Sequence, residues 1–284
     1  MVLLEDFILI NGVKIPKLGF GTWQIPDDKA EDAVCFALKN GYRHIDTATA
    51  YNNEEGVGRG IKKSGVKREE IFITTKVPAF VKTGEETEKV IASSLKKLGV
   101  DYIDLLLIHA PKPWQEIMSG SEKTYFEENI AVWKVMEKAY KQGKVRALGV
   151  SNFTPADMEN IKKNCEVPIT VNQIKLFIGF ELSTTMKYCE QNGILVEGYS
   201  PIATGELLSN PEIIEMAQKY GVSVPRLCIR YVLQRNALPL PKSTHEEYIA
   251  ENSKIDFEIS EKDMEYLRSL SDTVKKYYGL TKGD

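Results

Sequence analysis

Short apolar runs alternate with longer amphipathic segments along most of the chain. The amphipathic segments repeat their apolar residues at helical spacing, and those at 27–41 and 85–99 each end on a glycine, a usual helix stop. Such alternation predicts βαβ units and a parallel sheet. The eight runs of β-strand type lie at residues 17–21, 43–46, 71–77, 103–109, 145–151, 169–174, 194–200 and 238–243.

Eight such units in 284 residues favour a (β/α)8 TIM barrel, and a doubly wound open sheet is the alternative. Before them, residues 7–15 (FILINGVKI) predict a β-hairpin with a two-residue type I′ turn at Asn11-Gly12. No linker or low-complexity tract interrupts the pattern, so we expect a single domain over residues 1–284. The connection at 110–129 is unusually long, which is typical of functional loops.

Composition and charge exclude several classes of protein. A formal net charge of -3 argues against a nucleic-acid binder. The start, MVLLEDFILI, lacks the basic region of a signal peptide, and no apolar run approaches the roughly 20 residues that span a bilayer. We therefore expect a cytoplasmic protein, without a membrane partner and simplest as a monomer. Four well-separated cysteines predict reduced, buried thiols: Cys35, Cys165, Cys189 and Cys228.

Several common cofactor and metal motifs are absent. No G-x-G-x-x-G follows a strand, so the usual dinucleotide fingerprint is missing, and no P-loop occurs. The three histidines, His44, His109 and His245, form no H-E-x-x-H motif, so a zinc site is not expected.

Polar residues gather at the ends of seven of the predicted strands. Working residues of a (β/α)8 barrel sit at the carboxyl ends of its strands, and cores exclude polar groups that lack partners. Each residue alone has a structural explanation, such as an ion pair or a helix cap, but the set predicts one site. Its members are Asp46 with Tyr51, Lys76, His109, Ser151, Asn152, Gln173, Tyr199, Ser200, Lys242, Ser243 and Thr244.

Four of these residues suggest a proton donor. A tyrosine is a poor acid at neutral pH, and a nearby ammonium from Lys76 should lower the pKa of Tyr51. Asp46 can hold Lys76 charged and aimed, and a neutral His109 can donate a hydrogen bond to a carbonyl oxygen. The set suits protonation of an alkoxide as hydride arrives from a cofactor.

In order along the chain, these motifs resemble the aldo-keto reductases over nearly the whole length. The matching segments are GFGTW (19–23), DTATAYNNE (46–54), ITTKV (73–77), LLLIHAP (105–111), RALGVSNF (146–153), VNQI (171–174), GYSP (198–201), and LPLPKST then AEN (238–252). The resemblance implies a TIM barrel whose N-terminal hairpin caps the barrel bottom. It also implies reduction of aldehyde or ketone carbonyls with NADPH bound without a Rossmann domain.

The resemblance assigns roles residue by residue. The implied catalytic set is Asp46, Tyr51, Lys76 and His109, with Tyr51 as proton donor. The implied substrate pocket contains Trp23, Ala110 and Trp114, and no metal is implied. The implied cofactor residues are Gly21, Thr22, Asp46, Ser151, Asn152, Gln173, Tyr199, Ser200, Pro201, Ile202, Lys242, Ser243, Thr244, Glu251 and Asn252.

The chain departs from the family pattern in three places. Many relatives have His-Trp-Pro at His109-Ala110-Pro111, so we expect a pocket that admits bulkier substrates. A glutamate and His-Pro commonly follow Gln173, where this chain has Ile-Lys-Leu-Phe. Tyr248 stands where an arginine is usual, so we expect NADPH to be preferred with measurable use of NADH. Whether the short tail, residues 275–284, covers the pocket is left open.

Two other classes of function remain as alternatives. A cofactor-binding or structural protein could share the fold, as relatives that serve channels or lenses do, but the intact tetrad disfavours it. A metal-dependent isomerase or hydrolase is disfavoured by the shortage of histidines, and activity insensitive to a chelator would remove it.

Overall fold

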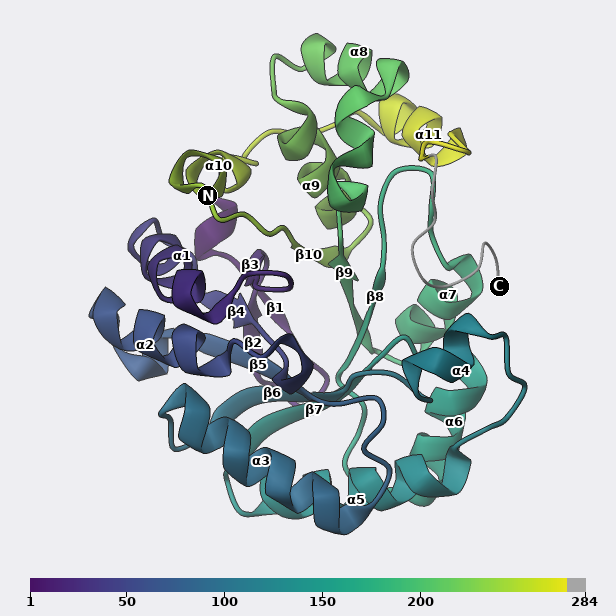
Figure 1. Cartoon of the computed structure of the whole chain (residues 1–284). Helices are drawn as coiled ribbons and strands as arrows, with labels where there is room; N and C mark the ends of the chain where they lie inside the picture. Colours follow the sequence, from purple (N-terminus) through teal and green to yellow (C-terminus); the bar gives the residue numbers. More distant parts are fainter. Residues whose placement is uncertain (275–284) are drawn as a thin grey trace.

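Eight parallel strands surrounded by helices form the body of the molecule. The structure, a computed structural model, describes residues 1–274, and the tail at 275–284 lies outside the described part. Figure 1 shows the strands gathered at the centre with the helices around them. The strands are β3 (Gly19–Gly21), β4 (His44–Asp46), β5 (Phe72–Val77), β6 (Ile103–Ile108), β7 (Val145–Ser151), β8 (Val171–Lys175), β9 (Leu195–Tyr199) and β10 (Ala237–Leu240).

The order of the strands decides between the two predicted architectures. Each strand pairs in parallel with its neighbour in sequence, from β3 through to β10. A doubly wound sheet would reverse its order at a switch point, so that alternative is wrong. The two end strands also meet, because the Gly21 N–H donates to the Pro241 carbonyl at 2.9 Å. The predicted (β/α)8 barrel is therefore confirmed.

The predicted N-terminal hairpin exists, but its turn differs from the prediction. Strands β1 (Asp6–Ile8) and β2 (Lys14–Pro16) pair antiparallel, and the Leu9 N–H donates to the Val13 carbonyl at 2.9 Å. A three-residue loop thus replaces the two-residue type I′ turn. Only its last residue, Gly12, has a positive φ, at 84°, whereas a type I′ turn requires positive φ at both central residues.

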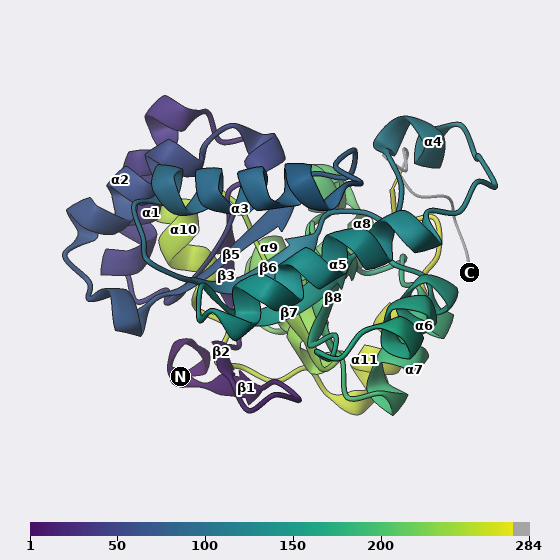
Figure 2. The ribbon, with the colours of Figure 1, turned by 90° about the horizontal axis from the view of Figure 1, so that it is seen from below.

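The hairpin closes the end of the barrel opposite the polar strand ends (purple, Figure 2). Leu9 and Ile15 belong to an apolar cluster with strand residues that point into the barrel, among them Phe72 and Leu105. The prediction that the hairpin caps the barrel bottom is confirmed. A larger apolar core lies between the strands and the surrounding helices.

The helices follow the predicted spacing, and both predicted helix stops hold. Gly99 follows α3 in the left-handed region, at φ 65°, and Gly41 follows α1 at φ 99°. The α-helices are α1 (Asp27–Lys39), α2 (Glu54–Ser64), α3 (Gly84–Leu98), α4 (Trp114–Met118), α5 (Phe126–Lys141), α6 (Pro155–Asn164), α7 (Ser183–Gln191), α8 (Pro211–Lys219), α9 (Val224–Gln234), α10 (Glu246–Asn252) and α11 (Glu261–Ser269). Short 3-10 helices are η1 (Val2–Leu4), η2 (Thr49–Tyr51), η3 (Arg68–Glu70) and η4 (Ala203–Ser209).

The four cysteines are free thiols, three of them buried and Cys165 partly exposed. Within residues 1–274, every helix is too short or too polar to cross a membrane.

Candidate active site

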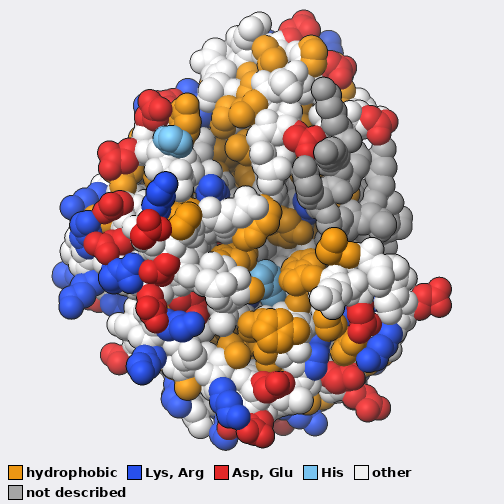
Figure 3. Space-filling view, in the orientation of Figure 1, with side chains coloured by type: hydrophobic (Ala, Val, Ile, Leu, Met, Phe, Trp, Pro, Cys, Tyr) orange, Lys and Arg blue, Asp and Glu red, His pale blue; other side chains and the backbone are white. Residues whose placement is uncertain are grey.

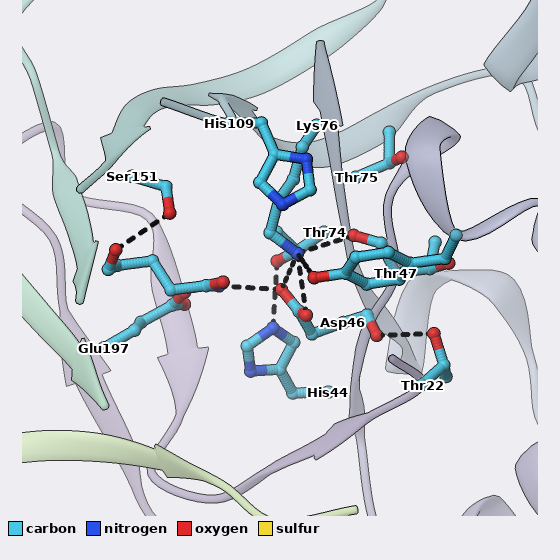
Figure 4. Close-up of polar contacts among 12 residues, drawn as sticks. Thr22, His44, Asp46, Thr47, Thr74, Thr75, Lys76, His109, Ser151 and Glu197 are labelled. Carbon is cyan, nitrogen blue, oxygen red and sulfur yellow. Dashed lines mark hydrogen bonds and ion pairs between the residues drawn. The ribbon is translucent and has the colours of Figure 1, made fainter. Parts of the chain in front are cut away.

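A buried ammonium group lies at the centre of the carboxyl end of the barrel. Lys76 Nζ donates to Asp46 Oδ1 and Oδ2 at 2.8 and 2.9 Å, and to the Thr47 carbonyl at 2.7 Å. It also lies 3.4 Å from the Tyr51 hydroxyl. Figure 4 shows the contact of Lys76 with Asp46. Strands β4 and β5 are paired in parallel, which brings Asp46 and Lys76 together at the same end of the sheet. Lys76 is fully buried, so its charge depends on the Asp46 carboxylate.

The loop that carries Tyr51 is held rigidly. Tyr51 ends the short helix η2, and Asn52 follows at a positive φ of 55°. The next residue, Asn53, is fully buried and donates to the Thr22 and Ile25 carbonyls, both at 2.9 Å. These bonds tie the loop to the end of β3, which fixes the position of the tyrosine above Lys76.

The direction of the Tyr51 pKa shift differs from the sequence-based expectation. Burial raises the pKa of Tyr51, and the Lys76 ammonium opposes this effect without reversing it. The expectation of a net lowering considered the ammonium alone and is wrong because it left out desolvation. Tyr51 is therefore protonated at neutral pH, which is the form that a proton donor requires.

His109, at the end of β6, is neutral. Burial, with a smaller contribution from Lys76, lowers the pKa of His109 to about 3. Its ring stands edge-on to Tyr51, with centroids 5.5 Å apart, and edge-on to Trp114 at 5.7 Å. Its Nδ1 is buried with no hydrogen-bond partner among the described residues. The neutral ring can donate one hydrogen bond, as the sequence analysis requires.

The three predicted pocket residues differ in exposure. Trp23 is 45% exposed, and Trp114 is partly exposed against the His109 ring. Ala110, which the resemblance implies in the pocket, has no exposed surface. The Ala110 and Pro111 carbonyls accept hydrogen bonds from Lys82 Nζ at 3.1 and 3.0 Å. Figure 3 shows a hollow at the centre of this face, ringed by hydrophobic side chains, with a histidine on its floor.

A second hydrogen-bonded group joins β7, β8 and β9. Ser151 Oγ donates to the Gln173 carbonyl at 2.9 Å, and Tyr199 donates from its hydroxyl to Asn152 Oδ1 at 2.9 Å. Asn152 Nδ2 in turn donates to Ser151 Oγ at 2.9 Å. The structure thus brings four of the predicted cofactor residues together, beside the four predicted catalytic residues.

Gln173 connects the two groups through a glutamate that the sequence analysis missed. Its Nε2 donates to Asp46 Oδ2 at 2.8 Å and to Glu197 Oε2 at 2.7 Å. Glu197 is fully buried in β9. Burial and the Asp46 carboxylate raise the pKa of Glu197 to about 8. The signal in the sequence was a glutamate within an apolar strand, two residues before Tyr199.

The remaining predicted cofactor residues lie at the ends of β3, β9 and β10. Thr22 is fully buried and donates to the Asp46 carbonyl at 2.9 Å, so its side chain supports the aspartate. A Cβ on Gly21 would lie 3.4 Å from the Leu240 carbonyl oxygen, at ordinary van der Waals distance, so Gly21 packs directly against the end of β10. Ser200 has a positive φ of 54°, and Pro201 and Ile202 follow it.

Lys242 fits the phosphate of a nucleotide. Its side chain is partly buried, burial lowers its pKa, and no ion pair neutralises it among residues 1–274. A partly buried ammonium without a counter-ion is suited to an anion. Ser243 is buried beside it and Thr244 is exposed. The two residues predicted at the adenine differ, since Asn252 is buried whereas Glu251 is paired with Lys254.

Tyr248, at the position where an arginine is usual, is 54% exposed and packs edge-on against His245 with ring centroids 5.4 Å apart. Over residues 1–274, no group of three or more His, Cys, Asp or Glu side chains is arranged to hold a metal ion.

Comparisons with known proteins relate the chain to one family. Residues 17–272 match the sequence profile of the Aldo/keto reductase family. Glyoxal reductase of Bacillus subtilis (strain 168) is 41% identical over 271 residues, which cover 94% of each protein. The solved structure of MGS-M4, an aldo-keto reductase enzyme from a Medee basin deep-sea metagenome library, is 36% identical with a TM-score of 0.88, covering 98% of this chain and 99% of that one. The crystal structure of Bombyx mori aldo-keto reductase in complex with NADP is 31% identical with a TM-score of 0.85, covering 95% and 94%.

Proposed function

The chain belongs to the aldo/keto reductase family, and from that premise we propose that it reduces small aldehydes or ketones with NADPH, Tyr51 being the proton donor. The observation that carries this proposal is the buried contact of Lys76 with Asp46 and the Tyr51 hydroxyl. An ion pair and a tyrosine at the open end of a barrel serve no packing need. Together they serve a reaction that places charge on an oxygen.

The chain's own residues would act as follows. Asp46 keeps Lys76 charged, and Lys76 stabilises negative charge on the Tyr51 oxygen as its proton leaves. Tyr51 donates that proton to the former carbonyl oxygen, and neutral His109 donates a hydrogen bond to the same oxygen. The nicotinamide, when bound, supplies the hydride.

The cofactor assignment rests on residues that fit a nicotinamide dinucleotide phosphate. Ser151, Asn152 and Gln173 would bond the carboxamide, and Tyr199 would stack on the ring. Lys242, Ser243 and Thr244 would hold the adenosine phosphate, which is favoured by a Lys242 ammonium without an ion pair among residues 1–274. The relative from Bombyx mori was solved in complex with NADP, which supports NADPH. We propose some use of NADH, because Tyr248 supplies no charge.

The substrate class follows from the rim and from the relatives. Trp23 and Trp114 give the opening an apolar wall. The glyoxal reductase at 41% identity supports small reactive aldehydes as substrates. We also propose that the whole chain, residues 1–284, is one domain that acts as a monomer in the cytoplasm. The one eight-stranded sheet of the barrel supports a single domain, and the free thiols support the cytoplasm.

Replacing one oxygen tests the proposal. Tyr51→Phe removes the proton donor and should lower the turnover of glyoxal with NADPH by on the order of 10² to 10⁴. NADPH binding, followed by fluorescence quenching, should survive. Tyr248→Phe is the matched control, because it removes the same oxygen from an exposed ring and should leave turnover unchanged. Wild-type turnover in Tyr51→Phe would refute the assignment of Tyr51.

A further inference from the structure

One buried amide bridges two carboxyl groups beneath the proposed nicotinamide site. Gln173 and Glu197 are direct neighbours in the pairing of β8 with β9. Gln173 Nε2 lies 2.7 Å from Glu197 Oε2 and, across the barrel, 2.8 Å from Asp46 Oδ2. Glu197 is fully buried and Gln173 is 2% exposed. Both N–H groups of this amide are therefore committed to carboxyl oxygens.

This arrangement fixes the orientation of the Gln173 amide. An ionised carboxylate only accepts hydrogen bonds, so the amide atom of Gln173 that faces Asp46 must be the nitrogen. Glu197 Oε2 accepts the second N–H of that nitrogen. The Gln173 carbonyl Oε1 is then turned away from both carboxyls, and it accepts no hydrogen bond from any described residue. On the proposed function, this oxygen is the acceptor for the amine of the nicotinamide carboxamide.

The Lys76 ammonium, which is paired with Asp46, also acts electrostatically on Glu197. Two charged groups act on Glu197. The Asp46 carboxylate, together with burial, raises the pKa of Glu197 to about 8, and the Lys76 ammonium opposes that shift. Its Oε1 is buried without a partner among the described residues, which disfavours the ionised form. Ionisation would add a second negative charge to the network that keeps Lys76 aimed at Tyr51.

We propose that Glu197 is a positioning residue of the reductase, which orients Gln173 toward the nicotinamide carboxamide and couples its own ionisation to the Asp46–Lys76 pair. The inference rests on the proposed function, because it assumes that Gln173 meets the carboxamide. It assigns a role to a buried glutamate that the proton transfer itself does not use.

The first test separates positioning from packing. Glu197→Met removes the acceptor and keeps an unbranched side chain, whereas Glu197→Gln keeps an acceptor for Gln173. The probes are NADP⁺ and its acetylpyridine analogue, in which an acetyl group replaces the carboxamide and no amine is present. We expect Glu197→Met to weaken NADP⁺ binding about 3- to 10-fold, the scale of one neutral hydrogen bond. The analogue should bind wild type and Glu197→Met equally, and Glu197→Gln should bind both as wild type does.

The second test uses the pH profile of kcat/KM for glyoxal reduction. In wild type, ionised Glu197 makes loss of the Tyr51 proton harder, so the rate should begin to fall at about pH 8. Glu197→Gln cannot ionise, and its fall should move at least about one pH unit higher. This test stands even if Glu197→Met does not fold.

The outcomes distinguish this inference from the proposed function. Equal weakening of NADP⁺ and its analogue in Glu197→Met would show a general packing defect and overturn the positioning role. An unchanged pH profile in Glu197→Gln would overturn the coupling. Absence of NADPH binding or carbonyl reduction in wild type would instead remove the proposed function itself.

Discussion

The two ends of the proposed cofactor site differ in how their charges are compensated. At the reaction end, Lys76 is fully buried and bonded to both oxygens of Asp46. At the phosphate end, Lys242 is only partly buried and has no ion pair within residues 1–274. The first lysine completes a network inside the folded protein, while the second is left available for a ligand. The same residue type therefore contributes to folding and reaction at one end, and to cofactor selection at the other.

One matched pair of substitutions exposes this difference most strongly. Lys76→Met leaves the Asp46 carboxylate buried without its cation, which should lower the free energy of unfolding by about 3–5 kcal/mol. Lys242→Met strands no charge and should stay within about 0.5 kcal/mol of wild type. Urea unfolding at neutral pH measures both. Equal losses in the two variants would remove the distinction between the two lysines.

For the preference between NADPH and NADH, Lys242 is expected to matter more than it does for stability. Lys242→Met should weaken NADPH binding by about 1.5 kcal/mol, or roughly tenfold, the lower end for a charged hydrogen bond because the side chain is partly exposed. NADH binding should barely change, since NADH lacks the 2′-phosphate. Dissociation constants for both cofactors provide the measurement. If both weaken alike, Lys242 contacts the pyrophosphate instead.

The buried histidines make the free energy of unfolding depend on pH. Burial lowers the pKa of His44 and of His109 to about 3, while an unfolded histidine titrates near about 6.5. As the pH falls from about 6.5 toward 3, the unfolded chain binds protons that the folded chain does not. Each histidine should then lower the free energy of unfolding by up to about 1.4 kcal/mol per pH unit.

Variants at two buried titratable groups check this pH dependence. His109→Gln should reduce the acid-side slope of the free energy of unfolding against pH by about one proton. Glu197 acts in the opposite sense, because its raised pKa makes the folded chain hold a proton that the unfolded chain releases above about pH 4.5. Glu197→Gln should therefore lessen the loss of stability between about pH 6.5 and 8. Parallel slopes in His109→Gln and wild type would contradict the buried, neutral histidine.

The smallest effect on cofactor binding is expected at Tyr248, an exposed position near the proposed phosphate-binding residues. Tyr248→Arg supplies a planar pair of donors, but residue 248 is 54% exposed, so salt screens the gain. We expect NADPH to bind tighter by about 0.2–1 kcal/mol, with NADH unchanged and the gain shrinking at high salt. An equal gain for both cofactors would show that residue 248 does not face the 2′-phosphate.

Spacing along the chain predicted the barrel, its strands and the residues at their ends, because alternating apolar periods define βαβ units locally. Distances across the barrel and burial could not be derived in the same way. The raised pKa of Tyr51 and the absence of exposed surface at Ala110 both result from burial in the folded chain. The link from Glu197 through Gln173 to Asp46 joins residues up to 151 positions apart. A buried glutamate signals that a partner exists, but a single sequence does not say which residue it is.

The central claim is that Asp46, Lys76 and Tyr51 act as one unit, and a double-mutant cycle on kcat tests it most directly. Residues that act as a unit show non-additive losses. Tyr51→Phe and Lys76→Met should each reduce kcat by on the order of 10² to 10⁴, with NADPH binding confirming that each variant is folded. The double variant should be no slower than Tyr51→Phe alone, since Lys76 acts on the reaction only through the tyrosine. Losses that multiply in the double variant would contradict the claim.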